Sequence, residues 1–234
     1  MTERRKKNRS IGLLIMLAGC LMVLAAAGLT GWNLLQGKRA ASASADMLSA
    51  LTEQMPEKKL ARSSVASYVA HAEDGLPLYE TAEDVEIPNQ MEIPLYLLAP
   101  NIPMPTVEID GRNYIGTISV PILGIELPVL EKCTYSGLRI APTRWSGSAY
   151  TNDLVICAHN YQRHFGTLKT LQPDDRVTFL DMDGNLFVYR VAEVEILQPD
   201  NVSEMENSEY DLTLYTCTIG GATRVTVRCI REEE

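Results

Sequence analysis

A cysteine near the carboxyl end of the chain is placed where it could act as a nucleophile. Cys217 ends the alternating segment Thr213–Cys217, which predicts a β-strand. Arg224 begins the next predicted strand, and the turn between them contains Gly220 and Gly221, which tolerate the positive φ angles of hairpin turns. A nearby cation favours the reactive thiolate, and a guanidinium supplies donors for an oxyanion or a substrate carbonyl. The pattern therefore predicts a nucleophilic site on two adjacent strands.

A histidine further upstream could complete this site. His159 follows the short apolar segment Leu154–Ala158, which predicts a buried strand that ends at the imidazole. Histidine is the commonest general acid and base in enzymes. Cys217, His159 and Arg224 are therefore the candidate catalytic residues.

Two of these candidates have rivals. His164 lies five residues after His159, but in a polar loop rather than at a strand end, so His159 is preferred. Arg228 shares a strand face with Arg224 because side chains alternate along a strand, but it lies further from the Cys217 turn. His71 is expected to be solvated.

Three segments of the chain resemble, in the same order, the signature segments of the sortases. These enzymes are cysteine transpeptidases that attach surface proteins to the Gram-positive cell wall or link pilin subunits. The segments are YIGTISVPILGIELPVLE from residue 114, VICAHNYQRHFGTL from residue 155, and TLYTC with Arg224. The resemblance covers roughly residues 107–231. It implies that Cys217 is the nucleophile, His159 the acid and base, and Arg224 the group that orients the substrate or binds the oxyanion.

The sequence departs from the family pattern at two places. Cys157 and Ala158 precede the histidine where the family usually has a small residue and Gly. The loop between Cys217 and Arg224 is also rather short.

The resemblance implies a membrane-anchored enzyme that cleaves an LPXTG-like sorting signal of secreted surface proteins or pilins. The acyl product would be joined to an amino group of a cell-wall precursor, with no cofactor and no metal. One alternative is a pilus-polymerising sortase that joins pilin subunits through a Lys. The chain lacks a C-terminal span and the lid tripeptide, Asp-Pro followed by an aromatic residue, and both absences count against that alternative. A second alternative is a non-catalytic, membrane-tethered β-domain that binds peptides.

The amino-terminal sequence predicts a single membrane span. Residues 11–35 form an uncharged apolar run of 25 residues, and about 20 suffice for a transmembrane helix. Five basic residues precede the run, so residues 1–10 are predicted to be a cytoplasmic tail and the catalytic domain to be extracytoplasmic. A signal peptide cleaved near residues 40–43 is the main alternative, and a buried core helix is a weaker one.

Charge narrows the possible partners. The formal net charge is −9 although the amino-terminal tail is basic, so the remainder of the chain is acidic. Phosphates would repel such a surface, which argues against nucleic acid as a partner.

Residues 36–106 are predicted to be an extracytoplasmic stalk or linker. Prolines recur from Pro77 to Pro105 and favour extended chain over helix. The apolar segment Ile93–Leu98 is expected to pack on the outside of the catalytic barrel, with a lid over the active site as the alternative.

Residues 107–234 are predicted to be the catalytic domain. Strands are expected at 114–120, 122–130, 154–158, 177–180, 186–197, 212–218 and 224–230, and a helical turn at 166–171. The pattern suggests a barrel or a sandwich. With the resemblance, the expected fold is mainly β, a closed β-barrel of seven to eight strands with short helices, preceded by a transmembrane helix.

The five cysteines receive different interpretations. Cys20 lies in the predicted span, and Cys229 should face the core together with Val225 and Val227. Cys157 is expected to be a packing residue, with contact to the catalytic groups as the alternative. A zinc site built from cysteines and His159 is disfavoured because the ligand spacing is wrong. The acidic run 203–209 is read as a solvated loop, with calcium binding as the alternative.

Overall fold

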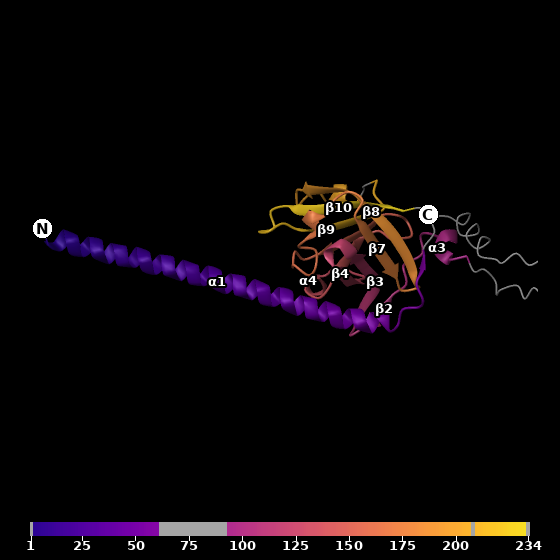
Figure 1. The fold of residues 1–234 in the computed structure, drawn as a ribbon, viewed down its shortest axis with the longest axis horizontal. Helices are drawn as coiled ribbons and strands as arrows, with labels where there is room; N and C mark the ends of the chain where they lie inside the picture. Colours follow the sequence, from indigo (N-terminus) through magenta and orange to yellow (C-terminus); the bar gives the residue numbers. More distant parts are fainter. Residues whose placement is uncertain (1, 61–92, 207–208, 233–234) are drawn as a thin grey trace, which may run out of the picture. The chain divides into compact units, whose positions relative to one another are not determined.

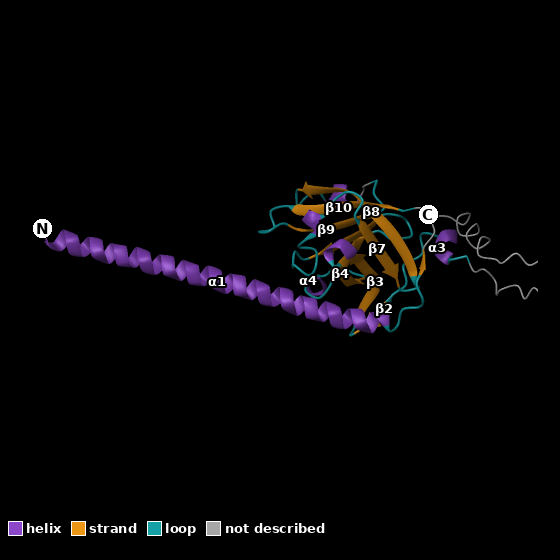
Figure 2. Ribbon diagram, viewed as in Figure 1, coloured by secondary structure: helices purple, strands orange, loops and turns teal. Residues whose placement is uncertain are grey.

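The computed structural model describes residues 2–60, 93–206 and 209–232 of the 234-residue chain. The chain divides into two compact units, Met1–Ala40 and Ala41–Glu234. Strands dominate the second unit and helices there are short (Figure 2). The strands are β1 Lys59–Leu60, β2 Val107–Ile109, β3 Arg112–Val120, β4 Ile125–Leu130, β5 Thr143–Ser146, β6 Leu154–Ala158, β7 Arg176–Asp181, β8 Asn185–Leu197, β9 Leu212–Cys217 and β10 Arg224–Arg231.

Eight of these strands close into a barrel (Figure 1). The order around the ring is β3-β4-β5-β6-β9-β10-β8-β7, and β7 pairs back onto β3. The pairs β4/β5 and β6/β9 are parallel, and the other pairs in the ring are antiparallel. Strand β1 pairs with the first two residues of β8, and β2 pairs with the first three residues of β3. The predicted mainly β fold with a closed barrel is confirmed.

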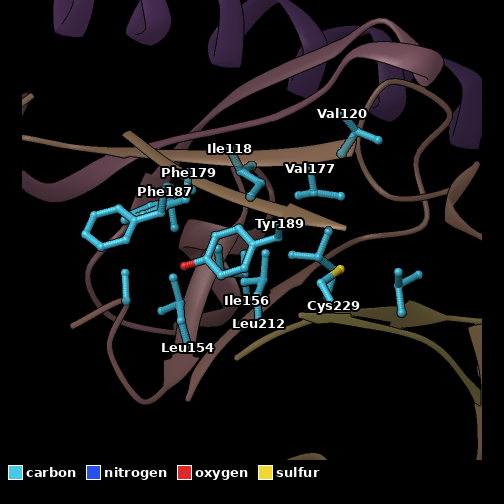
Figure 3. Close-up of a cluster of buried hydrophobic side chains, with 14 of the residues drawn as sticks. Ile118, Val120, Leu154, Ile156, Val177, Phe179, Phe187, Tyr189, Leu212 and Cys229 are labelled. Atoms are coloured by element: carbon cyan, nitrogen blue, oxygen red, sulfur yellow. The ribbon is translucent and has the colours of Figure 1, made fainter. Parts of the chain in front are cut away.

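The barrel interior is filled by apolar side chains from all of its strands except β5 (Figure 3). The most deeply buried include Ile118, Ile156, Phe179, Phe187 and Tyr189. Cys229 is completely buried in the same cluster, together with Val225 and Val227. Its predicted inward orientation is confirmed.

The boundaries of the strands that were predicted agree closely with the structure, apart from the start of β4. Residues Pro121–Leu123 form the 3-10 helix η1 rather than the start of β4, and Gly124 ends it with a φ of 61°. Strands β1, β2 and β5 were not predicted. The helical turn expected at 166–171 is the 3-10 helix η2, Leu168–Thr170.

Helix α1 extends from Thr2 to Thr52, beyond the predicted end of the apolar span. From Leu13 onward it is long and apolar enough to cross a membrane. It ends four residues before Pro56, which cannot continue a helix. In the second unit, Leu51 near the end of α1 is buried in a cluster with Tyr114 and Leu130.

The apolar segment Ile93–Leu98 packs on the barrel, as predicted. It contains the short helix α3, Leu95–Leu98, whose Tyr96 stacks on Tyr150 with ring centroids 4.9 Å apart. Tyr96 also contacts Phe187, near the start of β8. Pro77 and Pro88, which predict extended chain, and His71, which is expected to be solvated, lie outside the described residues.

The lid alternative for this segment is wrong. Leu197 at the far end of β8 pairs with Arg224, whereas Phe187 lies ten positions earlier. At about 3.3 Å per residue, Phe187 and Leu197 are roughly 30 Å apart along β8. Helix α3 therefore covers the end of the barrel opposite the candidate site.

Candidate active site

The ends of β6 and β9 bring His159 and Cys217 to the same edge of the barrel. The two strands are parallel, with Cys157 opposite Tyr215 and Ala158 opposite Thr216. His159 and Cys217 each lie one position beyond the last pair. The carboxyl ends of parallel neighbours meet at one edge of a sheet, so the register places these two residues side by side.

Arg224 lies directly opposite Cys217 in the antiparallel pair β9/β10. Directly opposed side chains in such a pair lie on the same face with Cβ atoms about 5 Å apart. The predicted grouping of the three residues is thus present at the level of strand register. Cys217, Arg224 and His159 are all half-buried, so each is held by its strand end while solvent reaches it.

A tight turn fixes the distance between Cys217 and Arg224. The backbone N–H of Thr218 donates to the carbonyl of Thr223 at 3.0 Å, and Gly220 and Gly221 adopt φ angles of 86° and 77°. The Arg224 guanidinium donates through Nη1 to the carbonyls of Gly221 and Thr223, both at 3.1 Å. Guanidinium has five N–H donors, and Nε and Nη2 make no hydrogen bond to the part of the chain that the structure describes, so they are available for a ligand.

The loop that follows His159 curls back on itself. The N–H of Phe165 donates to the carbonyl of His159 at 3.3 Å, and the N–H of Gly166 donates to the carbonyl of Tyr161 at 3.0 Å. A Cβ on Gly166 would lie 2.5 Å from the Asn160 carbonyl oxygen, so only glycine fits there. The Asn160 amide in turn donates to the carbonyl of Thr218 at 3.4 Å, which links this loop to the Cys217 turn.

Two tyrosines and an arginine surround the His159 ring. Its centroid lies 6.2 Å from that of Tyr135 and 5.0 Å from that of Tyr161. Arg139 stacks over Tyr135, with its guanidinium carbon 4.7 Å from the ring centroid. Burial and the positive charge of Arg139 lower the pKa of His159 below its ordinary value. The neutral imidazole, able to accept a proton, is therefore favoured at neutral pH.

His164 is a core residue rather than a second candidate base. It is completely buried, although it belongs to a polar stretch of sequence. Its Nε2 lies 3.1 Å from Oγ of Ser44, in the part of α1 that belongs to the second unit. The polar sequence of the loop gave no sign of this burial, because Ser44 is distant from His164 in the chain.

Arg228 is also a structural residue. Only 3% of it is exposed, and Nε donates to the Glu195 carboxylate at 2.7 Å. Its other nitrogens donate to Oγ1 of Thr213 and to the carbonyl of Glu204, both at 3.0 Å. These bonds hold the short helix α5, Val202–Glu206, against β9 and β10. The predicted common face of Arg224 and Arg228 is confirmed by the pairs that they form with β9.

Several residues around the site were not singled out from the sequence. Tyr135 begins the short helix α4, Tyr135–Leu138, and Arg139 follows it. This helix is more than 75 positions from Cys217 in the chain. Tyr161 offered a weak signal, since it lies two positions after His159. Cys157 is buried beneath the site with its Sγ 3.6 Å from Sγ of Cys133, a partner that no sequence pattern indicated.

Comparison with known proteins assigns the class of this barrel. Residues 118–232 match the family model described as the sortase domain. A curated relative, sortase A of Bacillus anthracis, is 28% identical over 115 residues, which cover 47% of this chain and 54% of the relative. Residues 118–232 therefore form a domain of the sortase family, as the motifs predicted.

Solved structures of sortases resemble the chain over a similar stretch. Sortase A from Corynebacterium diphtheriae is 21% identical, with a TM-score of 0.49 over 53% of this chain and 62% of that structure. A pilus-related sortase C of Group B Streptococcus is 27% identical, with a TM-score of 0.46 over 53% and 69%. The chain spans little more than half the length of its curated relative, sortase A of Bacillus anthracis.

Proposed function

We propose that the chain is a membrane-anchored cysteine transpeptidase that cleaves an LPXTG-like sorting signal and passes the acyl product to an amine of a cell-wall precursor. The observation that carries this proposal is the strand register, which places Cys217 opposite Arg224 and beside His159. Sortases as a family are cysteine transpeptidases. The sorting signal and the acceptor amine are this proposal's own extension from the family to this chain.

The geometry supports a two-step acyl transfer. The neutral imidazole of His159 takes the proton of the Cys217 thiol as Sγ attacks the scissile carbonyl carbon. Arg224 donates to the oxygen on which negative charge develops. The imidazolium then gives its proton to the departing amine, which leaves a thioester on Cys217.

The second step reverses the roles of the same groups. An incoming amine attacks the thioester carbonyl, and His159 accepts its proton as the new amide forms. The thiolate of Cys217 leaves and is reprotonated. The lowered pKa of His159 suits both steps, because the imidazolium formed in each is a readier proton donor than an unperturbed one.

The proposed arrangement at the membrane follows from the charge distribution. The apolar part of α1 crosses the bilayer once, residues 1–10 stay in the cytoplasm, and residues 36–106 lead to a catalytic domain of 107–234 outside. Within the linker region, Leu51 and Tyr96 pack on the barrel, so part of the linker contributes to its stability.

A covalent intermediate tests the proposed chemistry. The full-length chain in detergent micelles is mixed with an LPXTG peptide, quenched in acid, and digested for mass spectrometry. The acyl fragment should be found on the peptide that contains Cys217, and added amines should discharge it as an amide. An unmodified Cys217 with an intact substrate peptide would leave only the non-catalytic peptide-binding alternative.

Replacing Arg224 with Lys is expected to lower kcat/KM by about 10²–10³-fold, the usual effect of losing one donor to an oxyanion. An ammonium is a point charge on a flexible stem and lacks the planar fork of donors. The turn should persist, because the two Gly residues and the Thr218–Thr223 bond define it. The measurement is the rate of amide formation by the full-length chain.

Arg228→Lys is the matched control for this substitution. It should lower the free energy of unfolding by about 1–3 kcal/mol, because a buried guanidinium loses several hydrogen bonds. Its kcat/KM, corrected for the folded fraction, should stay near that of the unmodified chain. A larger loss of kcat/KM in Arg228→Lys than in Arg224→Lys would remove Arg224 from the proposed site.

Replacing Arg139 with Gln is expected to shift the acid limb of the kcat/KM profile to higher pH. Burial and then the Arg139 charge lower the pKa of His159, so removing the charge raises it back toward 6.5. The base is then lost to protonation at a higher pH as pH falls. Lys58→Gln removes another exposed cation, which lies next to β1 at the opposite end of β8, and should leave the profile unchanged. Equal profiles for Arg139→Gln and the unmodified chain would contradict the electrostatic coupling.

A further inference from the structure

The proposed mechanism leaves a second pair of thiols unused. Sγ of Cys133 lies 3.6 Å from Sγ of Cys157, and Oγ1 of Thr143 lies 3.2 Å from the latter. Cys157 is 4% exposed, whereas Cys133 is only partly buried. One thiol of the pair can therefore be reached from solvent, and the other lies behind it.

The sheet holds these two cysteines in place. Cys157 pairs with Thr143 across β5/β6, and Thr143 pairs with Leu130 across β4/β5. Cys133 follows Leu130 by three positions, in the connection that leads into α4. The sulfur atoms are thus brought together by three neighbouring strands. A disulfide requires an S–S distance of about 2.0 Å, so a side-chain movement of roughly 1.5 Å would join them.

The protonation states of the two thiols differ. A hydrogen bond from Cys157 lowers the pKa of Cys133 to about 6, against the opposing effect of burial. The same hydrogen bond, together with burial, raises the pKa of Cys157. Cys133 is therefore a partly exposed thiolate and Cys157 a buried thiol that donates to it. This is the arrangement of an attacking and a resolving cysteine.

We propose that Cys133 and Cys157 form a dithiol site that closes into an intramolecular disulfide by exchange with a disulfide-bearing protein. The Cys133 thiolate attacks one sulfur of the donor disulfide and releases the other as a thiolate. Cys157 gives its proton to that thiolate and attacks Sγ of Cys133, which breaks the mixed disulfide and releases the donor's second sulfur. The donor takes up two electrons: its first sulfur leaves with the proton of Cys157, and its second leaves as a thiolate that carries the charge that Cys133 brought.

Closure of this bond would act on the surroundings of His159. Cys133 leads into the segment that carries Tyr135 and Arg139, and Cys157 lies two positions before His159. A disulfide would fasten that segment to β6. A metal site is not the alternative, because no group of three or more metal-binding side chains occurs among the described residues.

The test uses the full-length chain in detergent micelles with Cys217→Ala, which removes the partly exposed thiol at the candidate site. The protein is equilibrated in mixtures of oxidised and reduced glutathione, which stand in for the disulfide donor, then acid-quenched, alkylated and digested without reduction. The expected product is a linked peptide pair containing Cys133 and Cys157, with both thiols lost in parallel. The oxidised barrel should also unfold at a higher temperature, and a reducing agent should reverse the shift.

Matched variants show whether the bond is specific. Cys133→Ser and Cys157→Ala, each in the same background, should abolish both the linked peptides and the thermal shift, whereas Cys20→Ala should preserve them. A glutathione adduct that persists on Cys133 while Cys157 remains a free thiol would overturn the proposal. So would two thiols that stay free in fully oxidised glutathione. Both results are read in the Cys217→Ala chain itself, so neither depends on the folding of Cys133→Ser or Cys157→Ala.

Discussion

Replacing Cys217 with Ala is expected to abolish acyl transfer, with a loss on the order of 10⁴-fold or more, because no thioester can form without the nucleophile. Cys217 is half-buried at the end of β9, so the loss of its sulfur removes little packing. The fold should therefore persist. The measurement is amide formation by the full-length chain from a sorting-signal peptide and an amine, alongside the thermal unfolding midpoint.

Two variants separate the role of Cys217 from that of thiols in general. Cys20→Ala removes a cysteine in the apolar part of α1 and should keep full activity. Cys217→Ser keeps the size of the side chain but offers a much weaker nucleophile, and it should be nearly as inactive as the Ala variant. Substantial acyl transfer by Cys217→Ala at an unchanged unfolding midpoint would show that Cys217 is not the nucleophile.

The strands that present the site were the easiest part of the fold to predict. Strand β6 is an unbroken apolar run that ends at the imidazole, and its observed bounds are those predicted. The alternation of β9 and β10 also predicts the correct faces, including the inward direction of Cys229. An alternating pattern predicts which face of the strand a residue lies on, because successive side chains of a strand point to opposite faces.

Other parts of the site depend on contacts between distant segments, and no local pattern encodes them. Cys133 meets Cys157 because β5 joins β4 to β6, and β5 itself is short and carries Arg144 and Trp145 rather than an apolar run. The burial of His164 depends on Ser44, which is 120 positions away in the chain. The extension of α1 to Thr52 was missed because its Ala- and Ser-rich sequence was read as linker, although Ala is the best helix former.

Replacing His159 with Ala is expected to lower kcat/KM by about 10²–10⁴-fold, the usual contribution of a general acid and base. The same group serves both steps of the proposed transfer, so formation of the thioester and its discharge by amines should both slow. The strand end should survive the change, because His159 lies beyond the last residue pair of β6 and is half-buried. The two rates can be separated by following acyl-enzyme formation with and without an added amine.

His164→Ala is the comparison that gives this prediction its force. The His164 ring is completely buried and lies against Ser44, so the substitution should lower the unfolding midpoint of the barrel. The folded fraction should nevertheless transfer acyl groups at close to the normal rate. His159→Ala should therefore lose activity but keep its stability. His164→Ala should lose stability but keep its activity. If His164→Ala were the inactive variant while His159→Ala kept its rate, the acid and base role would belong to His164, and the register that places His159 beside Cys217 would have no catalytic meaning.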